Sequence, residues 1–319
     1  MSIAPLSISD VREAAERIRP FVHRTPVQTS QTLDKLAGRD VFCKCELFQK
    51  TGAFKYRGAT NAVQKLDDTA AARGVITHSS GNHGQALALA AQVRGIPATI
   101  VMPASASPVK KAAILGYGAQ VVESGPSLAD REAVVAELQA KTNAVLIPPF
   151  DHADVIAGQG TAAMELLEDV PDLDCVIAPI GGGGLISGFC LAARGMSTKC
   201  RVFGAEPVGA DAAARSKELG EMAKLANPQS IADGLLANNL GKITWPIIRD
   251  HVERVFTVSE AEIIQAMRFV WERMKLVIEP SAAVGIAVIL SEEFRALDGL
   301  QKVGVVLCGG NVSLDKLYW

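Results

Sequence analysis

The sequence lacks the features that mark membrane-spanning and secreted proteins. No apolar stretch reaches the roughly 18 residues that suggest a spanning helix, since residues 86–103 are interrupted by Gln92, Arg94, Gly95 and Pro97. The N-terminal residues have neither a basic start nor a hydrophobic core, so they do not resemble a secretory signal. We therefore expect a cytoplasmic protein with no membrane partner.

Further classes are excluded by what is missing from the charge and cysteine patterns. A formal net charge of −2 provides no basic footprint for nucleic acid. The six cysteines include no Cys-x-x-Cys pair, and Cys43 and Cys45 lie in a strand-like segment. The cysteines are most simply reduced thiols of a core rather than parts of a disulfide or zinc framework.

Strand-like apolar runs alternate with helical patterns along nearly the whole chain, which is typical of an α/β protein with parallel sheets. The length of 319 residues exceeds what one hydrophobic core usually serves, so two domains are expected. The expected strands cover residues 74–78, 98–102, 119–122, 175–180, 201–205 and 303–307. No flexible linker separates the two series of strands. We therefore expect two domains that interleave around a cleft.

Four consecutive glycines, Gly181, Gly182, Gly183 and Gly184, follow the apolar run 175–180 and precede a helical segment. Without Cβ atoms, their backbone N–H groups can turn toward one anion, and the positive end of the helix dipole adds to the attraction. The pattern predicts a phosphate-binding loop. The alternative is a mobile surface loop or a tight packing turn.

Nucleotide motifs do not account for these glycines. Glu206 lies about 23 residues further on, near where a dinucleotide fold carries its ribose-binding acid. That motif, however, needs a glycine at position 186 or 187, where the chain has Ile186 and Ser187. A P-loop would need Gly-Lys-Ser or Gly-Lys-Thr, and neither follows. The phosphate of a different cofactor is therefore expected.

Two polar segments suggest what that cofactor does. Lys55 follows a glycine turn and is flanked by Phe54 and Tyr56, so partial burial can lower its pKa and free an amine for Schiff-base chemistry. The alternative interpretation of Lys55 is a solvated lysine on a helix. Residues 78–85 place hydroxyls, an amide and an imidazole at the end of an expected strand, where helix N–H groups can hold a substrate carboxylate. His83 alone is typical of a helix start, and we assign it no proton transfer.

Together with Cys308-Gly309-Gly310-Asn311, these motifs resemble the fold-type II enzymes that use pyridoxal 5′-phosphate (PLP). The resemblance spans essentially the whole chain and is greatest to serine racemases and serine/threonine ammonia-lyases, including 3-hydroxyaspartate dehydratases. It implies a fold like that of the tryptophan synthase β-subunit, with the cofactor in the cleft. A large PLP-binding domain would comprise residues 1–73 and 152–319, and a small mobile substrate domain residues 74–151.

The resemblance also implies roles for individual residues. Lys55 would hold the cofactor and then act as base on one face of the substrate, and Ser80 would act on the opposite face. The cofactor-binding residues would be Lys55, Phe54 beside the ring, Asn82 at the ring hydroxyl, Gly181, Gly182, Gly183 and Gly184 at the phosphate, and Cys308 at the pyridine nitrogen. A thiol cannot firmly protonate that nitrogen, which favours rapid loss of a β-hydroxyl. The substrate-binding residues would be Ser79, Ser80, Gly81, Asn82, His83 and Arg131.

Substrate choice depends on two further positions. Arg131 matches an arginine that can swing toward a second carboxylate, which a guanidinium binds bidentately, so 3-hydroxyaspartate would join serine as a substrate. The alternative is a solvated helix charge. Phe150 stands where mammalian serine racemases carry an asparagine, so threonine and a β-aryl serine remain candidates.

Two regulatory sites are implied as well. Glu206 and the Ala210 carbonyl match ligands of a Mg²⁺ or Ca²⁺ site, although the family's aspartate is Ala212 here. Seven positions resemble ATP contacts at the dimer interface of serine racemases: Ser30, Lys50, Thr51, Gln85, Lys110, Tyr117 and Asn311. A homodimer with ATP as an allosteric activator is therefore expected.

The sequence thus predicts PLP-dependent α,β-elimination of β-hydroxy amino acids such as L-serine, L-threonine or 3-hydroxyaspartate, giving keto acid and ammonia, with serine racemisation possible through Ser80. The alternatives are a β-replacement enzyme of the cysteine-synthase kind, a dehydratase specific for β-aryl serine, and a binding or dinucleotide protein without PLP chemistry. The Ser80 loop and the Cys308 segment favour elimination.

Overall fold

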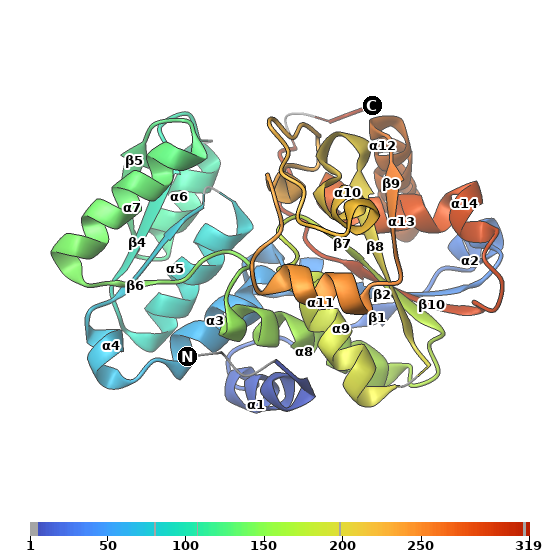
Figure 1. Cartoon of the computed structure of the whole chain (residues 1–319), viewed down its shortest axis with the longest axis horizontal. Coiled ribbons are helices and arrows are strands. Elements are labelled where there is room, and N and C mark those ends of the chain that lie inside the picture. The colour runs from blue at the N-terminus through green and yellow to red at the C-terminus, as the bar shows by residue number, and fades with distance from the viewer. Residues whose placement is uncertain (1–5, 80, 107, 198, 315–316) are drawn as a thin grey trace.

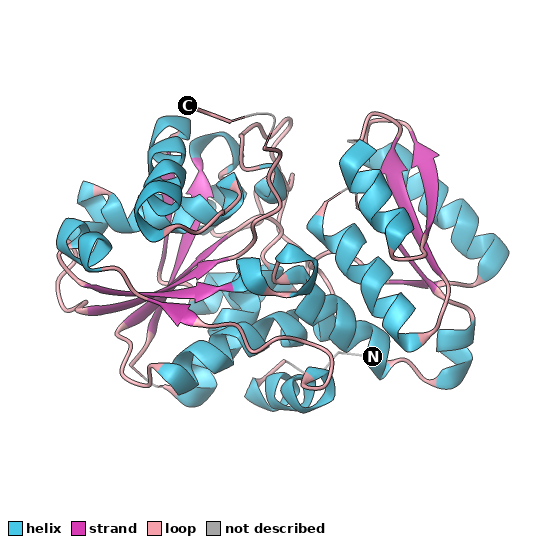
Figure 2. Ribbon diagram, turned by 180° about the vertical axis from the view of Figure 1, so that it is seen from behind, coloured by secondary structure: helices cyan, strands magenta, loops and turns pink. Residues whose placement is uncertain are grey.

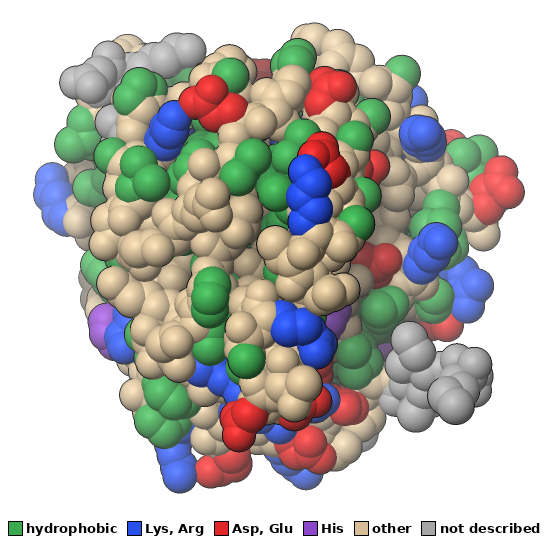
Figure 3. All heavy atoms as spheres, turned by 90° about the vertical axis from the view of Figure 1, so that its left-hand side faces the viewer, with side chains coloured by type: hydrophobic (Ala, Val, Ile, Leu, Met, Phe, Trp, Pro, Cys, Tyr) green, Lys and Arg blue, Asp and Glu red, His purple; other side chains and the backbone are tan. Residues whose placement is uncertain are grey.

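The computed structural model describes residues 6–79, 81–106, 108–197, 199–314 and 317–319. Two sheets organise the chain, and helices cover both of them (Figures 1 and 2). No helix in these ranges is both long and apolar enough to cross a membrane. On the face seen in Figure 3, basic and acidic side chains are interspersed, so neither sign of charge gathers there.

The large sheet has six strands, in the order β1-β2-β10-β7-β8-β9. Their bounds are β1 (Val27–Gln28), β2 (Asp40–Cys45), β10 (Lys302–Leu307), β7 (Cys175–Pro179), β8 (Arg201–Pro207) and β9 (Arg254–Val258). Every pair is parallel except β1 with β2. The central strand β7 is buried along its whole length, which explains why its sequence is a continuous apolar run rather than an alternating one.

The small sheet has four parallel strands, in the order β5-β4-β3-β6. Their bounds are β3 (Val75–His78), β4 (Ala98–Pro103), β5 (Gln120–Ser124) and β6 (Val145–Leu146). The chain leaves the large sheet after β2, forms the small sheet, and returns to build β7 to β10. The two interleaved parallel-sheet units confirm the predicted fold class. The exact domain bounds stay a prediction.

The helices connect and cover these strands. They are α1 (Ile8–Ile18), α2 (Gln31–Ala37), α3 (Lys55–Lys65), α4 (Asp68–Ala72), α5 (Asn82–Arg94), α6 (Pro108–Gly116), α7 (Leu128–Thr142), α8 (Ala153–Asp169), α9 (Gly184–Met196), α10 (Ala212–Leu219), α11 (Thr244–His251), α12 (Glu260–Phe269), α13 (Pro280–Leu290) and α14 (Glu292–Arg295). A π-helical turn, Val270–Met274, follows α12. Helix α3 packs against both α5 and α8, so it lies where the two units meet (Figure 1).

Candidate active site

Lys55 is the first residue of α3, and its side chain turns into the region between the two units. Its Nζ donates a hydrogen bond to the Pro149 carbonyl at 2.6 Å and lies 5.1 Å from the centre of the Phe54 ring. Burial lowers the pKa of Lys55 to about 8. With this pKa a minority of the amine is neutral near physiological pH, whereas a solvated lysine with the ordinary pKa is almost fully protonated.

A buried ion network fixes the helix that carries Lys55. The Arg57 guanidinium donates to Glu46 and to Glu165, each at 2.7 Å. Lys44 donates to the second oxygen of Glu165, also at 2.7 Å. All four side chains are buried, and their charges balance. Because α3 is tied in this way to β2 and α8, the start of the helix has a defined position.

Cys308 lies next to this helix start. The Phe54 N–H donates to the Cys308 carbonyl at 3.0 Å, and Ala53 forms an isolated bridge with Gly309. The Cys308 side chain is 3% exposed, and burial raises the pKa of its thiol well above the usual value. The group at the predicted ring-nitrogen position is therefore a neutral thiol.

The glycine loop joins β7 to α9 and packs closely against the segment that follows β6. Gly183 has a φ of +93°, which favours glycine. At Gly182, a Cβ would collide with the ring of the half-buried Phe150. Packing thus accounts for part of the glycine pattern, so the turn alternative considered for the sequence is partly correct.

The same loop also fits a phosphate group. None of the hydrogen bonds described for this part of the chain uses the N–H of Gly182, Gly183 or Gly184, and α9 directs its N-terminus to this point. Free N–H groups at a helix start form a natural anion site. Thr244 of α11 fixes the position of the loop, because its hydroxyl donates a hydrogen bond to the Gly182 carbonyl at 2.8 Å.

Asn82 is the first residue of α5, and both ends of its amide are engaged. Its Nδ2 donates to the two carboxylate oxygens of Glu279 at 2.9 and 3.1 Å, and its Oδ1 accepts from Asn311 at 2.9 Å. Glu279 was not among the residues predicted from sequence. An acid before Pro280 reads as an ordinary helix start, so no local signal distinguishes it.

The predicted substrate loop lies at the carboxyl end of β3. The Gly81 N–H donates to the Ser79 hydroxyl at 3.3 Å, while Ser80 lies outside the described residues. His83 is buried, with Nε2 2.9 Å from the Ile147 carbonyl, and burial lowers its pKa to about 3. A neutral His83 held by a carbonyl agrees with assigning it no proton transfer.

Arg131 is a half-buried residue near the start of α7. Its Nε donates to the Ser127 carbonyl at 3.3 Å. The pKa of His78, the last residue of β3, is lowered by burial and then by the charge of Arg131. The guanidinium thus lies within electrostatic range of the strand end that precedes the substrate loop.

The predicted cation ligands lie apart from Lys55, at the end of β8. The Glu206 carboxylate accepts hydrogen bonds from the N–H groups of Ala213 and Ala214, each at 2.9 Å, and so caps α10. Asp211 pairs with Arg215. The described residues contain no cluster of three or more His, Cys, Asp or Glu that could hold a metal ion.

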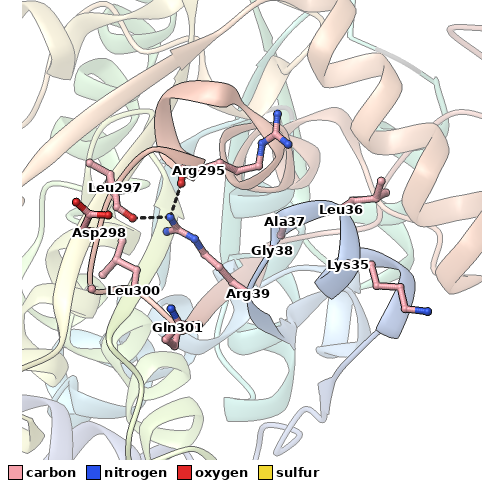
Figure 4. A pocket seen from close by; sticks show the side chains of 11 residues that line it. Lys35, Leu36, Ala37, Gly38, Arg39, Arg295, Leu297, Asp298, Leu300 and Gln301 are labelled. Carbon is pink, nitrogen blue, oxygen red and sulfur yellow. Dashed lines mark hydrogen bonds between the residues drawn. The ribbon is translucent and has the colours of Figure 1, made fainter.

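A cavity of about 400 Å³ lies elsewhere, between the end of α2 and the turn before β10 (Figure 4). Arg39 crosses it and donates to the carbonyls of Arg295 and Leu297 at 2.8 and 2.6 Å. None of the residues predicted for catalysis or cofactor binding lines this cavity. The neutral thiol of Cys308 and the buried amine of Lys55 instead lie together at the start of α3.

Comparison with known proteins identifies the family of the chain. Residues 18–309 match the family described as pyridoxal-phosphate dependent enzyme. The chain is 48% identical to a serine racemase of Arabidopsis thaliana over 314 residues, covering 98% of this chain and 95% of the relative. It is 48% identical to a beta-hydroxyaspartate dehydratase of Paracoccus denitrificans (strain Pd 1222) over 310 residues, covering 97% and 98%. The crystal structure of serine racemase from Dictyostelium discoideum superposes with a TM-score of 0.93 at 48% identity, covering 97% of this chain and 99% of that one.

Proposed function

Because the chain belongs to the family of pyridoxal-phosphate dependent enzymes, we propose that it eliminates water from β-hydroxy amino acids to give an enamine. Hydrolysis of the enamine takes up water and releases ammonia and a keto acid. The observation that carries this proposal is the buried Lys55 amine, with a pKa of about 8, beside the neutral thiol of Cys308. A dehydratase of this kind and a serine racemase are named among the relatives that match nearly the whole chain. L-Serine, L-threonine and 3-hydroxyaspartate are the proposed substrates.

The residues around the cleft would have separate roles in binding the cofactor and in moving the proton. When bound, PLP supplies the electron sink that weakens bonds at the substrate α-carbon. Lys55 would hold the cofactor and then take the proton from that carbon, since an amine of pKa about 8 can both accept and release a proton near neutrality. The N–H groups of Gly182 to Gly184 would bind the phosphate. Asn82 would orient the cofactor ring by a hydrogen bond to the hydroxyl group of that ring.

Cys308 and the substrate loop would decide the outcome of the reaction. A neutral thiol at the ring nitrogen leaves that nitrogen without a firm proton, so departure of the β-hydroxyl is favoured over a long-lived carbanion. The hydroxyl of Ser79 and the N–H groups at the start of α5 would bind the substrate carboxylate. Ser80 would supply a second proton group on the opposite face, which would allow serine racemisation.

A substrate panel tests this function. Purified holoenzyme would be incubated with L-serine, D-serine, L-threonine, 3-hydroxyaspartate and phenylserine, and keto acid and enantiomer would be measured separately. Keto acid from a β-hydroxy substrate supports the proposal. A product that forms only with added sulfide would favour β-replacement, and keto acid from phenylserine alone would favour a β-aryl dehydratase.

Two residues bear on substrate choice. Arg131 would bind the second carboxylate of 3-hydroxyaspartate, and the supporting observation is its charge near the end of β3. Phe150 forms an apolar wall against Gly182. We propose that this wall admits the methyl group of threonine, which a comparison of kcat/KM for threonine and for serine in Phe150→Asn would test.

A divalent cation is proposed at Glu206 and the Ala210 carbonyl. Glu206 would be the only carboxylate ligand, and its oxygens already accept two helix N–H groups. Affinity for Mg²⁺ or Ca²⁺ falls as charged ligands are lost, so millimolar rather than micromolar cation should be needed. The test is the melting temperature of chelator-treated enzyme as cation is added back, and no change at any concentration would remove this site.

We also propose a cytoplasmic homodimer that ATP activates. The positions expected to contact ATP include the turn Lys50-Thr51-Gly52, where Thr51 adopts a φ of +62° and its buried hydroxyl has no described partner. Light scattering would give the mass of the assembly. ATP titration would be followed by rate and melting temperature, and the absence of any effect on both would contradict activation. Cell fractionation tests the compartment.

A further inference from the structure

Glu279 precedes α13 in the N-cap position, but its carboxylate does not cap that helix. An acid at this position normally accepts a hydrogen bond from an N–H group of the first turn. Among the residues that the structure describes, no such bond to Glu279 is present, and the residue is only 3% exposed. The carboxylate instead accepts from Asn82 Nδ2, at 2.9 and 3.1 Å. The Glu279 carboxylate therefore does not stabilise α13 and instead binds Asn82 of the small-sheet unit.

The segment around Cys308 is fitted to the same carboxylate. The Asn311 N–H donates to Glu279 Oε2 at 3.1 Å, and the Glu279 N–H donates to the Gly309 carbonyl at 3.1 Å. A Cβ on Gly309 would lie 2.9 Å from the carboxyl carbon and from both of its oxygens. The glycine is therefore needed for the close approach of this backbone to Glu279.

The contacts leave one N–H of Asn82 available. A primary amide nitrogen carries two hydrogens, and one of them, directed between the two oxygens of the carboxylate, accounts for both contacts with Glu279. The amide oxygen is held by Asn311 Nδ2, which also donates to the Thr51 carbonyl at 2.7 Å. Because the oxygen and one hydrogen are fixed by groups of the large-sheet unit, the direction of the second hydrogen is fixed as well.

We propose that Glu279 is a positioning residue that holds the Asn82 amide with its free N–H directed at the cofactor, so that cofactor affinity depends on a buried carboxylate of the other unit. The inference rests on the proposed role of Asn82 in binding PLP. Glu279 touches neither substrate nor cofactor in this scheme and acts through Asn82.

Several charged groups face Glu279. Burial raises its pKa to about 7, and the charge of Asp233 adds to the rise, while the hydrogen bonds from Asn82 and Asn311 and the charge of Lys110 oppose it. Lys110 of α6 pairs with Asp233 at 2.9 Å, which forms a second link between the units. Lys55 and Cys308 lie within electrostatic range on the cleft side. A proton on Glu279 would compete with the N–H groups of Asn82 and Asn311 for its oxygens.

The test is a double-mutant cycle on PLP affinity, measured by titrating PLP into the apoenzyme and following visible absorbance. Glu279→Gln places an amide nitrogen against the N–H donors of Asn82 and Asn311, and it should weaken PLP binding about tenfold. In an Asn82→Ala background, Glu279→Gln should have little further effect. Wild-type affinity should fall as the pH drops through about 7. Glu279→Gln should lose this component and keep only the dependence that Lys55 causes near pH 8.

Glu262→Gln is the matched control, because Glu262 is an acid in the capping box of α12, remote from Asn82. It should leave PLP affinity unchanged. If Glu279→Gln does not fold, Asn311→Ala removes the partner of the Asn82 oxygen and should weaken PLP binding severalfold. Unchanged affinity in Asn82→Ala would overturn the proposed role of Asn82. Weakened binding in Asn82→Ala, with additive or absent effects of Glu279→Gln, would overturn the positioning role alone.

Discussion

Lys55 Nζ lies 2.6 Å from the carbonyl oxygen of Pro149, 94 residues further along the chain. The next residue, Phe150, packs on the glycine loop. One short segment after β6 therefore contacts both the reactive amine and the expected phosphate site. This relationship brings two motifs far apart in sequence together, as the proposed binding of one cofactor by both requires.

Replacing Lys55 should abolish attachment of PLP. Lys55→Ala removes the only amine placed at the cleft by α3, so the visible absorption band of the bound cofactor should disappear after dialysis. The matched control is Lys65→Ala, which changes the last residue of the same helix and breaks only an exposed pair with Asp154. A band that persists in dialysed Lys55→Ala would remove Lys55 from this role.

The rate of PLP attachment should rise with pH and level off above about pH 8. Burial lowers the pKa of Lys55 to about 8, so below that pH most of the amine is protonated and cannot attack the aldehyde. Stopped-flow absorbance after mixing apoenzyme with PLP measures the rate. A rate that continues to climb toward pH 10, the range of a solvated lysine, would contradict this prediction.

Racemisation and elimination should separate at Ser80. Ser80→Ala removes the proposed proton group on one face of the substrate but leaves Lys55 on the other. We expect interconversion of L- and D-serine to be lost, while much of the keto acid formation from L-serine remains. Chiral chromatography and a keto acid assay on the same samples provide the comparison. Equal loss of both activities would rule out the two-face assignment.

Arg131 should affect only substrates with a second carboxylate. Arg131→Gln removes a bidentate donor, so KM for 3-hydroxyaspartate should rise by about tenfold or more, with little change for L-serine. Lys141→Gln is the control, because Lys141 lies on the same helix in an exposed pair with Glu137. Equal changes for both substrates would indicate a solvated helix charge.

Arg57 should be important for stability rather than for substrate choice. Arg57→Met leaves Glu46 and Glu165 buried with only Lys44 as a counter-charge, and breaking such a pair costs about 3–5 kcal/mol. Arg24→Met, which removes exposed pairs with Glu168 and Asp169, should cost about 0–1 kcal/mol. Urea unfolding of the two holoenzymes tests the difference, and similar midpoints would contradict it.

Much of the fold could be predicted because its signals are local. The six expected strands correspond to β3, β4, β5, β7, β8 and β10. The apolar runs reflect burial on both faces except in β5, an edge strand whose residues are exposed or half-buried. Strands β1 and β6 have two residues each, which is too short for any pattern to identify. Strand β9 lies at a sheet edge with mixed burial, so its sequence is less distinctive.

By itself, the sequence determined the α/β class, the glycine loop before α9, and a lysine suited to PLP, because backbone freedom, hydrophobic runs and family motifs are properties of neighbouring residues. Only the tertiary structure decided which groups meet. Glu279 contacts Asn82 across 197 residues, and Phe150 occupies the space that Gly182 leaves open. Such contacts depend on how the two sheet units pack, and no local pattern encodes the buried partner that an amide or a glycine acquires when the chain folds.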